Sequence, residues 1–281
     1  MQDEIDAVAE RLGALAESRP APPPPRPAQL PDTDDDAALA MDDAERVPDP
    51  DGIAEGQTFM IEYMDTKGDV STRRITVLEV ITNKRGDPSL KARCHERKAQ
   101  RRFRVDSILS CIDLDGEVHD HPVTFLNAAL GLDLDPAIQP PDRDDAEDDY
   151  TPPKPPQDWH KINRMIVPHF SVLAALSRSD GTMRDAEVRV ARDHCARLAA
   201  EEGFPVSDLT LEWIEKSIRR RHPTRGYIKR TMNDMRLWPP HHVTDLLIAA
   251  LELIDVDGQR DPAEVALVNE ISVAVTGMKM A

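Results

Sequence analysis

The chain has few cysteines, no long apolar run and no basic N-terminal segment. Its three cysteines, Cys94, Cys111 and Cys195, are widely spaced and form no CxxC pair, so they favour reduced thiols over a disulfide framework. No stretch reaches the roughly 18–20 apolar residues of a membrane span, and the acidic N-terminus lacks the basic region of a signal peptide. We therefore expect a soluble, cytoplasmic protein with no membrane contact.

Short catalytic motifs are also missing. The sequence contains no P-loop, no dinucleotide-binding glycine pattern and no nucleophile with a nearby base. Cysteines and histidines between positions 94 and 121 match no structural zinc spacing. We therefore expect that the protein is not an enzyme.

What the chain does have is a basic island in an acidic protein. The 281 residues carry a formal charge of −17, yet residues 71–104 hold eleven Lys or Arg against three Asp or Glu, a local charge of +8. Such a cluster attracts phosphate groups. Any anion binding is therefore expected to be local to this segment.

The N-terminal fifth of the chain is predicted to be a short helix on a tether. Apolar residues recur at helical spacing in 1–19, and the Pro- and Asp-rich segment 20–51 that follows cannot bury apolar area, so it is predicted to be a disordered linker. Two interpretations stay open: a solubilising tail with a marginal helix, or a helix that docks on a protein partner.

The rest of the chain is predicted to be α+β, with two domains. Residues 52–131 alternate as strands over Thr58–Tyr63, Val70–Thr82, 90–96 and 102–105, which favours a small antiparallel β-barrel of the SH3/Sm-like kind. An acidic, Pro-rich linker is predicted at 132–158. Helical periodicity in 162–176, 186–199, 208–218, 242–254 and 262–275 predicts a separate all-α domain over 159–281.

One family resemblance lies in the β segment. The stretches Ile61-Glu-Tyr63, Gly68, Arg73–Val77, 90–96 and Arg101–Ile108 resemble the WYL domain, an SH3/Sm-like barrel of bacterial transcription regulators and phage-defence proteins. Ser89-Leu90-Lys91 stands where the family has Trp-Tyr-Leu, and no helix-turn-helix precedes the barrel.

The resemblance implies a sensor pocket for a nucleotide or single-stranded nucleic acid. Arginine suits this role because its guanidinium binds phosphate oxygens in pairs and stacks on bases. Alternation along 102–104 would place both arginines on one face and Phe103 in the core. The alternative is that the acidic linker at 133–149 covers this basic face. The implied ligand residues are Arg73, Arg74, Arg93, Arg97, Arg101, Arg102 and Arg104.

An Asp-Gly pattern repeats 77 residues apart in the helical segment, at Asp180-Gly181 and Asp257-Gly258, each followed by a glutamate seven residues after the Asp. One interpretation is a capped corner between two helices, with acidic residues complementing the helix dipole. The other is a divalent-cation site, because a carboxylate, a Gly turn and a distant Glu also converge in calcium loops.

The segment 174–187 resembles the TerB fold of tellurite-resistance proteins, and the likeness extends over roughly 165–277. The resemblance implies Ca²⁺ or Mg²⁺ binding by acidic residues. The second repeat is expected to be the better site because it gathers more carboxylates. The implied metal ligands are Asp180, Glu187, Asp255, Asp257, Asp261 and Glu264.

A third charged feature lies between the repeats. Residues 214–230 hold seven Lys or Arg, which indicate a second anion-attracting patch or a solvated helix face. Taken together, the sequence predicts a sensor or regulator of a bacterial stress or defence response that binds a nucleotide or single-stranded nucleic acid. The alternative is a metal-responsive scaffold in which the helical domain is the sensor and the barrel a protein-interaction module.

Overall fold

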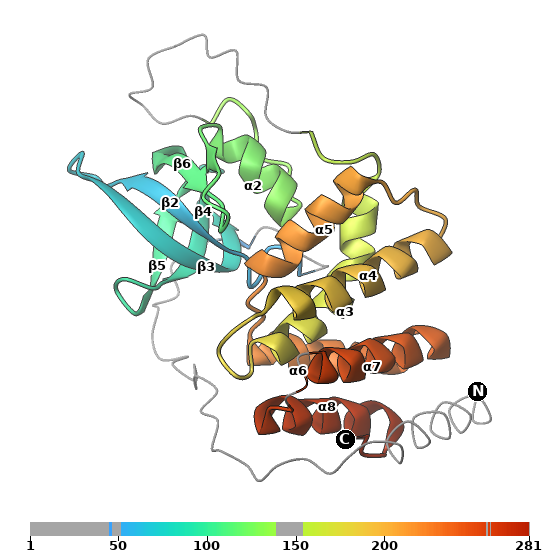
Figure 1. Ribbon diagram of the computed structural model, residues 1–281. Coiled ribbons are helices and arrows are strands. Elements are labelled where there is room, and N and C mark those ends of the chain that lie inside the picture. Colours follow the sequence, from blue (N-terminus) through green and yellow to red (C-terminus); the bar gives the residue numbers. More distant parts are fainter. Residues whose placement is uncertain (1–44, 47–51, 139–153, 257, 259, 281) are drawn as a thin grey trace. The chain divides into compact units, whose positions relative to one another are not determined.

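The computed structural model describes residues 45–46, 52–138, 154–256, 258 and 260–280. The predicted N-terminal helix at 1–19 and the larger part of both predicted linkers lie outside the described residues. The described part contains an antiparallel sheet and a set of α-helices (Figure 1), which confirms the α+β prediction. Among its helices none is long and apolar enough to cross a membrane.

Contacts divide the described residues into two compact units. The sheet unit comprises 45–46, 52–138, 154–167 and the short segment 220–222. The helical unit comprises 168–219 and 223–280, with gaps at 257 and 259. The boundary falls within the helix α3, Trp159–Ser177.

The sheet has the strand order β5-β4-β3-β2-β6-β7, and all its pairings are antiparallel. A two-residue strand β1 (Glu45–Arg46) pairs with the end of β3. Asp65 shapes the turn between β2 and β3, where its carboxylate accepts hydrogen bonds from the backbone N–H groups of Lys67 and Asp69. The other strands are β2 (Thr58–Met64), β3 (Val70–Thr82), β4 (Pro88–Cys94), β5 (Ala99–Arg104), β6 (Ile108–Ile112) and β7 (Val118–His119).

One face of this sheet forms a continuous apolar core with helix α2 (Pro122–Leu130). The side chains of Phe59 and Phe125 meet edge to face with ring centroids 5.2 Å apart. A short 3-10 helix, η1 (Val105–Ser107), connects β5 to β6. Pairing between β5 and β6 would close the sheet into a barrel, and it is not among the pairings of the described strands, so the SH3/Sm-like barrel stays a prediction.

The start of the predicted acidic linker packs against the sheet core. Leu134 is buried, and Leu132 and Ile138 contact the core cluster. The side-chain amide of Asn127 holds this segment by donating to the Leu134 carbonyl (3.0 Å) and accepting from the Leu134 N–H (2.8 Å). In the sequence these apolar residues are interspersed with aspartates, so the composition alone indicates a linker.

The helical unit contains the remainder of α3 and five further α-helices with a buried apolar interior. The short helix α6 was not predicted as a separate element, because basic residues recur throughout 219–230 and obscure its apolar periodicity. Pro223 separates it from α5, since proline lacks an N–H and cannot continue the helix. The five are α4 (Asp185–Glu201), α5 (Asp208–Arg220), α6 (Arg225–Asp234), α7 (Pro240–Asp255) and α8 (Pro262–Thr276).

Both Asp-Gly repeats form helix-to-helix corners. Gly181 and Gly258 adopt positive φ values of 92° and 73°, a region that glycine occupies without steric cost. The next helix is capped in each case. Glu187 accepts the backbone N–H of Arg184 at the start of α4, and Asp261 accepts the N–H of Ala263 at the start of α8.

Candidate anion-binding face

The strand register sorts the basic residues between the two faces of the sheet. Lys91 of β4 lies opposite Arg102 of β5, whereas Leu90 lies opposite Phe103. Phe103 is only 4% exposed and belongs to the core. The predicted alternation is therefore confirmed: Arg102 and Arg104 lie on the outer face and Phe103 on the core face.

The outer face continues onto β3 and past the end of β4. Arg93 lies opposite Thr76, and Arg74 is two residues before Thr76 on the same strand. His95 directly follows β4, and its backbone N–H donates to the Arg74 carbonyl (3.0 Å). We call this surface the basic face; it consists of Arg74, Lys91, Arg93, His95, Arg102 and Arg104.

The structure thus separates the seven predicted ligand residues. Four of them lie on the basic face: Arg74, Arg93, Arg102 and Arg104. Arg73 and Arg101 lie on the other side, opposite the core residues Ile61 and Ala92. Arg97 lies in the turn between β4 and β5. Lys91 and His95 were missed as site residues, although the alternation rule applied to β4 would have found Lys91.

Two cations of the basic face already have acidic partners. Lys91 Nζ lies 3.4 Å from Glu79 Oε2, and the Arg104 guanidinium pairs with the Asp106 carboxylate. In contrast, Arg74 and Arg93 form no ion pair with any residue that the structure describes. Among the described residues, an anion at Arg74 and Arg93 would therefore not have to displace a carboxylate from either guanidinium.

His95 lies beside these two arginines, two residues after Arg93 and opposite Arg74, and two threonine hydroxyls hold its ring. Its Nε2 is 2.8 Å from the Thr76 hydroxyl, which in turn lies 2.7 Å from the hydroxyl of the fully buried Thr58. Partial desolvation lowers the pKa of His95, and the positive charges of Arg74 and Arg93 lower it further. The imidazole is therefore neutral at neutral pH, and a bound anion would favour its protonation.

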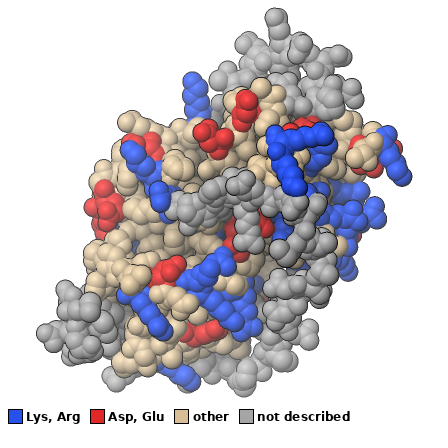
Figure 2. Space-filling view, turned by 180° about the vertical axis from the view of Figure 1, so that it is seen from behind, with Lys and Arg blue, Asp and Glu red and all other residues tan. Residues whose placement is uncertain are grey.

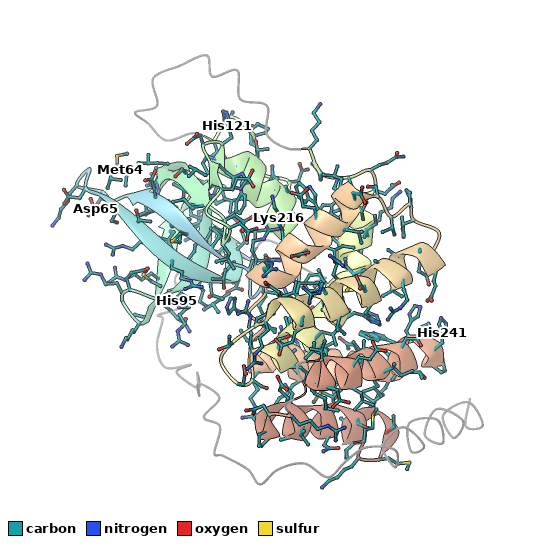
Figure 3. The ribbon with its side chains drawn as sticks, in the orientation of Figure 1. Met64, Asp65, His95, His121, Lys216 and His241 are labelled. Carbon is teal, nitrogen blue, oxygen red and sulfur yellow. The ribbon has the colours of Figure 1, made fainter. Side chains whose placement is uncertain are left out.

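The figures show how this surface is composed. Lys and Arg side chains gather densely at the right-hand margin of Figure 2. Figure 3 marks His95 beside the strands of the sheet, at the end of β4 that pairs with the start of β3, the same end as the turn that follows Met64 and carries Asp65. Two guanidinium groups without an ion pair to any described residue, and an imidazole next to them, form a set of donors that suits phosphate oxygens.

This geometry agrees with a family comparison. Residues 51–112 match the WYL domain. The match covers the strands β2 to β6, which carry the whole basic face, and confirms the resemblance for this part of the chain. No curated protein and no solved structure matches the chain. Nothing in these comparisons supports the resemblance of the helical unit to the TerB fold.

The six predicted metal ligands are distributed over both repeats. Most of these carboxylates already form an ion pair with an arginine or cap a helix. Arg184 pairs with Asp180 (2.8 Å) and Glu187 (3.1 Å), and Arg260 pairs with Asp255 (2.7 Å). Asp261 caps α8, Glu264 is buried, and Asp257 lies outside the described residues. Within the described chain no group of three His, Cys, Asp or Glu side chains is arranged to hold a metal. Calcium or magnesium binding stays a prediction.

The second basic stretch is largely neutralised. Arg219 pairs with Glu215 (2.8 Å) and Asp185 (3.0 Å). Arg220 and Arg221, which belong to the sheet unit, are buried instead of solvated. Arg221 donates to the carbonyl of Ile53, and Arg220 pairs with Asp113 (2.9 Å). The solvated-face interpretation is therefore wrong for these two arginines.

Proposed function

We propose that the protein is a non-enzymatic sensor and regulator whose WYL domain binds a nucleotide or single-stranded nucleic acid through the basic face. The observation that carries this proposal is the placement of Arg74, Arg93 and His95 side by side, with both guanidinium groups free of ion pairs to described residues. WYL domains occur in regulators that sense ligands and bind nucleic acids, which supports a regulatory role.

Phosphate is the ligand group that this surface favours. Guanidinium groups bind phosphate oxygens through charge-assisted hydrogen bonds, which are stronger than neutral ones. The Thr58–Thr76–His95 chain fixes the imidazole and gives the site a defined centre. The helical unit would then present the ligand state to a protein partner in a bacterial stress or phage-defence response, whether or not it is TerB-like.

The test compares two double variants of the full chain. Arg74→Ala/Arg93→Ala removes two cations from the basic face, and Arg97→Ala/Arg101→Ala removes two cations from the same segment but outside that face. Fluorescence anisotropy with a labelled single-stranded oligonucleotide, and competition with a nucleoside triphosphate, measures binding. Each lost contact should cost about 1–3 kcal/mol, so the first variant should bind at least tenfold more weakly.

The control variant should bind like the wild type, apart from a small change in long-range attraction. Equal losses in the two variants would mean that only total charge matters and would contradict a defined site. Competition by the triphosphate would identify a nucleotide as a sufficient ligand, and failure to compete would leave single-stranded nucleic acid as the ligand class. No binding of either probe by the wild type would overturn the proposal.

A further inference from the structure

The helical unit contains a second polar site, unrelated to the basic face. A cavity of about 230 Å³ opens between α3, α4 and α7. Three imidazoles, two carboxylates and one guanidinium line it: His169, His194, His242, Glu201, Asp245 and Arg197. Three histidines from three different helices are an unusual lining for a cavity in an otherwise apolar interior.

Two of the imidazoles already lie at the spacing of ligands on one metal ion. His169 Nδ1 and His194 Nε2 are 3.1 Å apart. Two nitrogens bound tetrahedrally to zinc at about 2.0–2.1 Å are separated by roughly 3.3 Å. The ring centroid of His169 lies 5.3 Å from that of His194 and 5.9 Å from that of His242. When three imidazoles bind one zinc ion, their ring centroids are roughly 5 Å apart, so both observed distances are close to this value.

The rings are held in place by their surroundings. Trp238 stacks on His169 with ring centroids 4.4 Å apart and an angle of 16° between the planes. Both His169 and His194 are almost completely buried. Their side chains therefore lose little additional freedom when they bind a ligand, which favours tight binding.

One ring nitrogen of this cluster also lacks a hydrogen-bond partner among the described residues. The Nε2 atom of His242 is buried without a hydrogen-bond partner among the described residues, and the nearest carboxylate oxygen, Glu202 Oε1, is 3.4 Å away.

We propose that this cavity binds one divalent transition-metal ion, with zinc as the best fit, through His169, His194 and His242. Neutral imidazole is a preferred zinc ligand, and three protein ligands with a fourth open position are a common zinc arrangement. Glu201 and Asp245 line the same cavity and more than balance the charge of Arg197, which leaves one negative charge for the cation.

Binding requires a small rearrangement. No three of these side chains surround a common point as they lie in the described structure. The His169–His194 hydrogen bond must break, and the His242 ring, at the more accessible edge of the cluster with 13% of its side chain exposed, must turn towards the pair. The bound ion would then connect α3, α4 and α7 and stabilise the helical unit.

Cobalt(II) is the probe for this site, because tetrahedral Co²⁺ absorbs visible light strongly. The full chain, purified without a histidine tag and treated with a chelator, is titrated with Co²⁺ and then with Zn²⁺. We expect one equivalent of Co²⁺ to give the tetrahedral spectrum and one equivalent of Zn²⁺ to abolish it. The same Zn²⁺ addition should raise the melting temperature.

Three variants make the result specific. His194→Gln and His242→Gln each remove one proposed ligand and should weaken binding by about tenfold or more. His160→Gln changes an exposed histidine of α3 outside the cavity and should bind like the wild type. If His194→Gln does not fold, His242→Gln decides the question alone. A wild type without a tetrahedral spectrum, or unchanged binding by the His242→Gln variant, would overturn the proposal.

Discussion

At the scale of single residues, His95 is the group whose charge would report anion binding. Its pKa lies below 6.5 because of partial desolvation and the flanking arginines. A phosphate held by Arg74 and Arg93 would raise that pKa. Between the pKa of His95 in the free protein and its pKa in the complex, binding would therefore take up a proton. Affinity should therefore increase as the pH falls through this window and stay constant above it.

The measurement is the dissociation constant of a short oligonucleotide between pH 5.5 and 8 at fixed ionic strength. The variant His95→Gln keeps a side chain that can hydrogen-bond Thr76 but cannot titrate, and its affinity should not vary with pH in this range. Identical pH profiles for wild type and variant would show that His95 does not contact the anion.

Asp113 and Arg220 form the most deeply buried ion pair of the sheet unit, with 3% and 5% of their side chains exposed. The Arg220 guanidinium also lies 5.7 Å from the centroid of the Phe125 ring. Asp113→Asn would leave the arginine charge buried without its counter-ion. It should reduce the free energy of unfolding by about 3–5 kcal/mol.

A matched control is available in Asp158→Asn, which removes the carboxylate of the exposed pair with Lys161. Exposed pairs contribute about 0–1 kcal/mol, so this variant should unfold almost as the wild type does. The double variant Asp113→Asn/Arg220→Met should recover part of the loss, because no uncompensated charge remains buried. Equal stability of the two single variants in urea unfolding would contradict the buried pair.

At the scale of elements, local patterns predicted most strands and helices. The strand Val70–Thr82 was predicted with the bounds it has, because β-branched residues fill it between two turn signals. The alternation rule also predicted the faces of Arg102 and Arg104. The same alternation places Lys91 of β4 on the outer face, and the antiparallel register then sets it opposite Arg102.

Other elements could not be predicted because tertiary contacts decide them. Arg220 and Arg221 read as solvated charges in the sequence, and only their partners Asp113 and Ile53, more than a hundred residues away, make them buried. The three cavity histidines are likewise separated by 25 and 48 positions in the chain. No short motif marks such a cluster, because three helices must pack before the rings meet.

The packing of α3, α4 and α7 makes the helical unit sensitive to acid. An unfolded chain protonates its histidines near pH 6.5, whereas the folded state holds His194 neutral down to about pH 4. The unfolded state therefore binds more protons between these values, and stability must fall as the pH decreases through that window. His194 alone should cost about 3 kcal/mol of stability over the full window.

Urea unfolding at pH 7.5, 6, 5 and 4, followed by tryptophan fluorescence (Trp159, Trp213 and Trp238), tests this expectation. The variant His194→Gln should be less stable at pH 7.5 but should lose less stability on acidification. His160→Gln, at an exposed position outside the histidine cluster, should follow the wild type. A wild-type midpoint that does not change between pH 7.5 and 5 would contradict the neutral buried cluster.

At the scale of the whole molecule, the charge distribution limits how nucleic acid can bind. The chain carries −17 overall, and the +8 of residues 71–104 is confined to one segment of the WYL domain. A polyanion is therefore attracted chiefly by this segment and repelled by the net negative charge of the chain as a whole. The sequence predicted this asymmetry directly, whereas the division of the arginines between two faces required the sheet register.

The salt dependence of binding should reflect the small number of phosphate groups that the basic face can contact. For single strands the logarithm of the binding constant falls with the logarithm of salt concentration with a slope of about −0.7 per phosphate neutralised. With Arg74, Arg93 and Arg102 as contacts, the slope for a short oligonucleotide should be about −2. Arg74→Ala/Arg93→Ala should reduce its magnitude to below about 1, while Arg97→Ala/Arg101→Ala should leave it unchanged. A steep slope shared by all three proteins would mean that the nucleic acid contacts cations beyond the basic face.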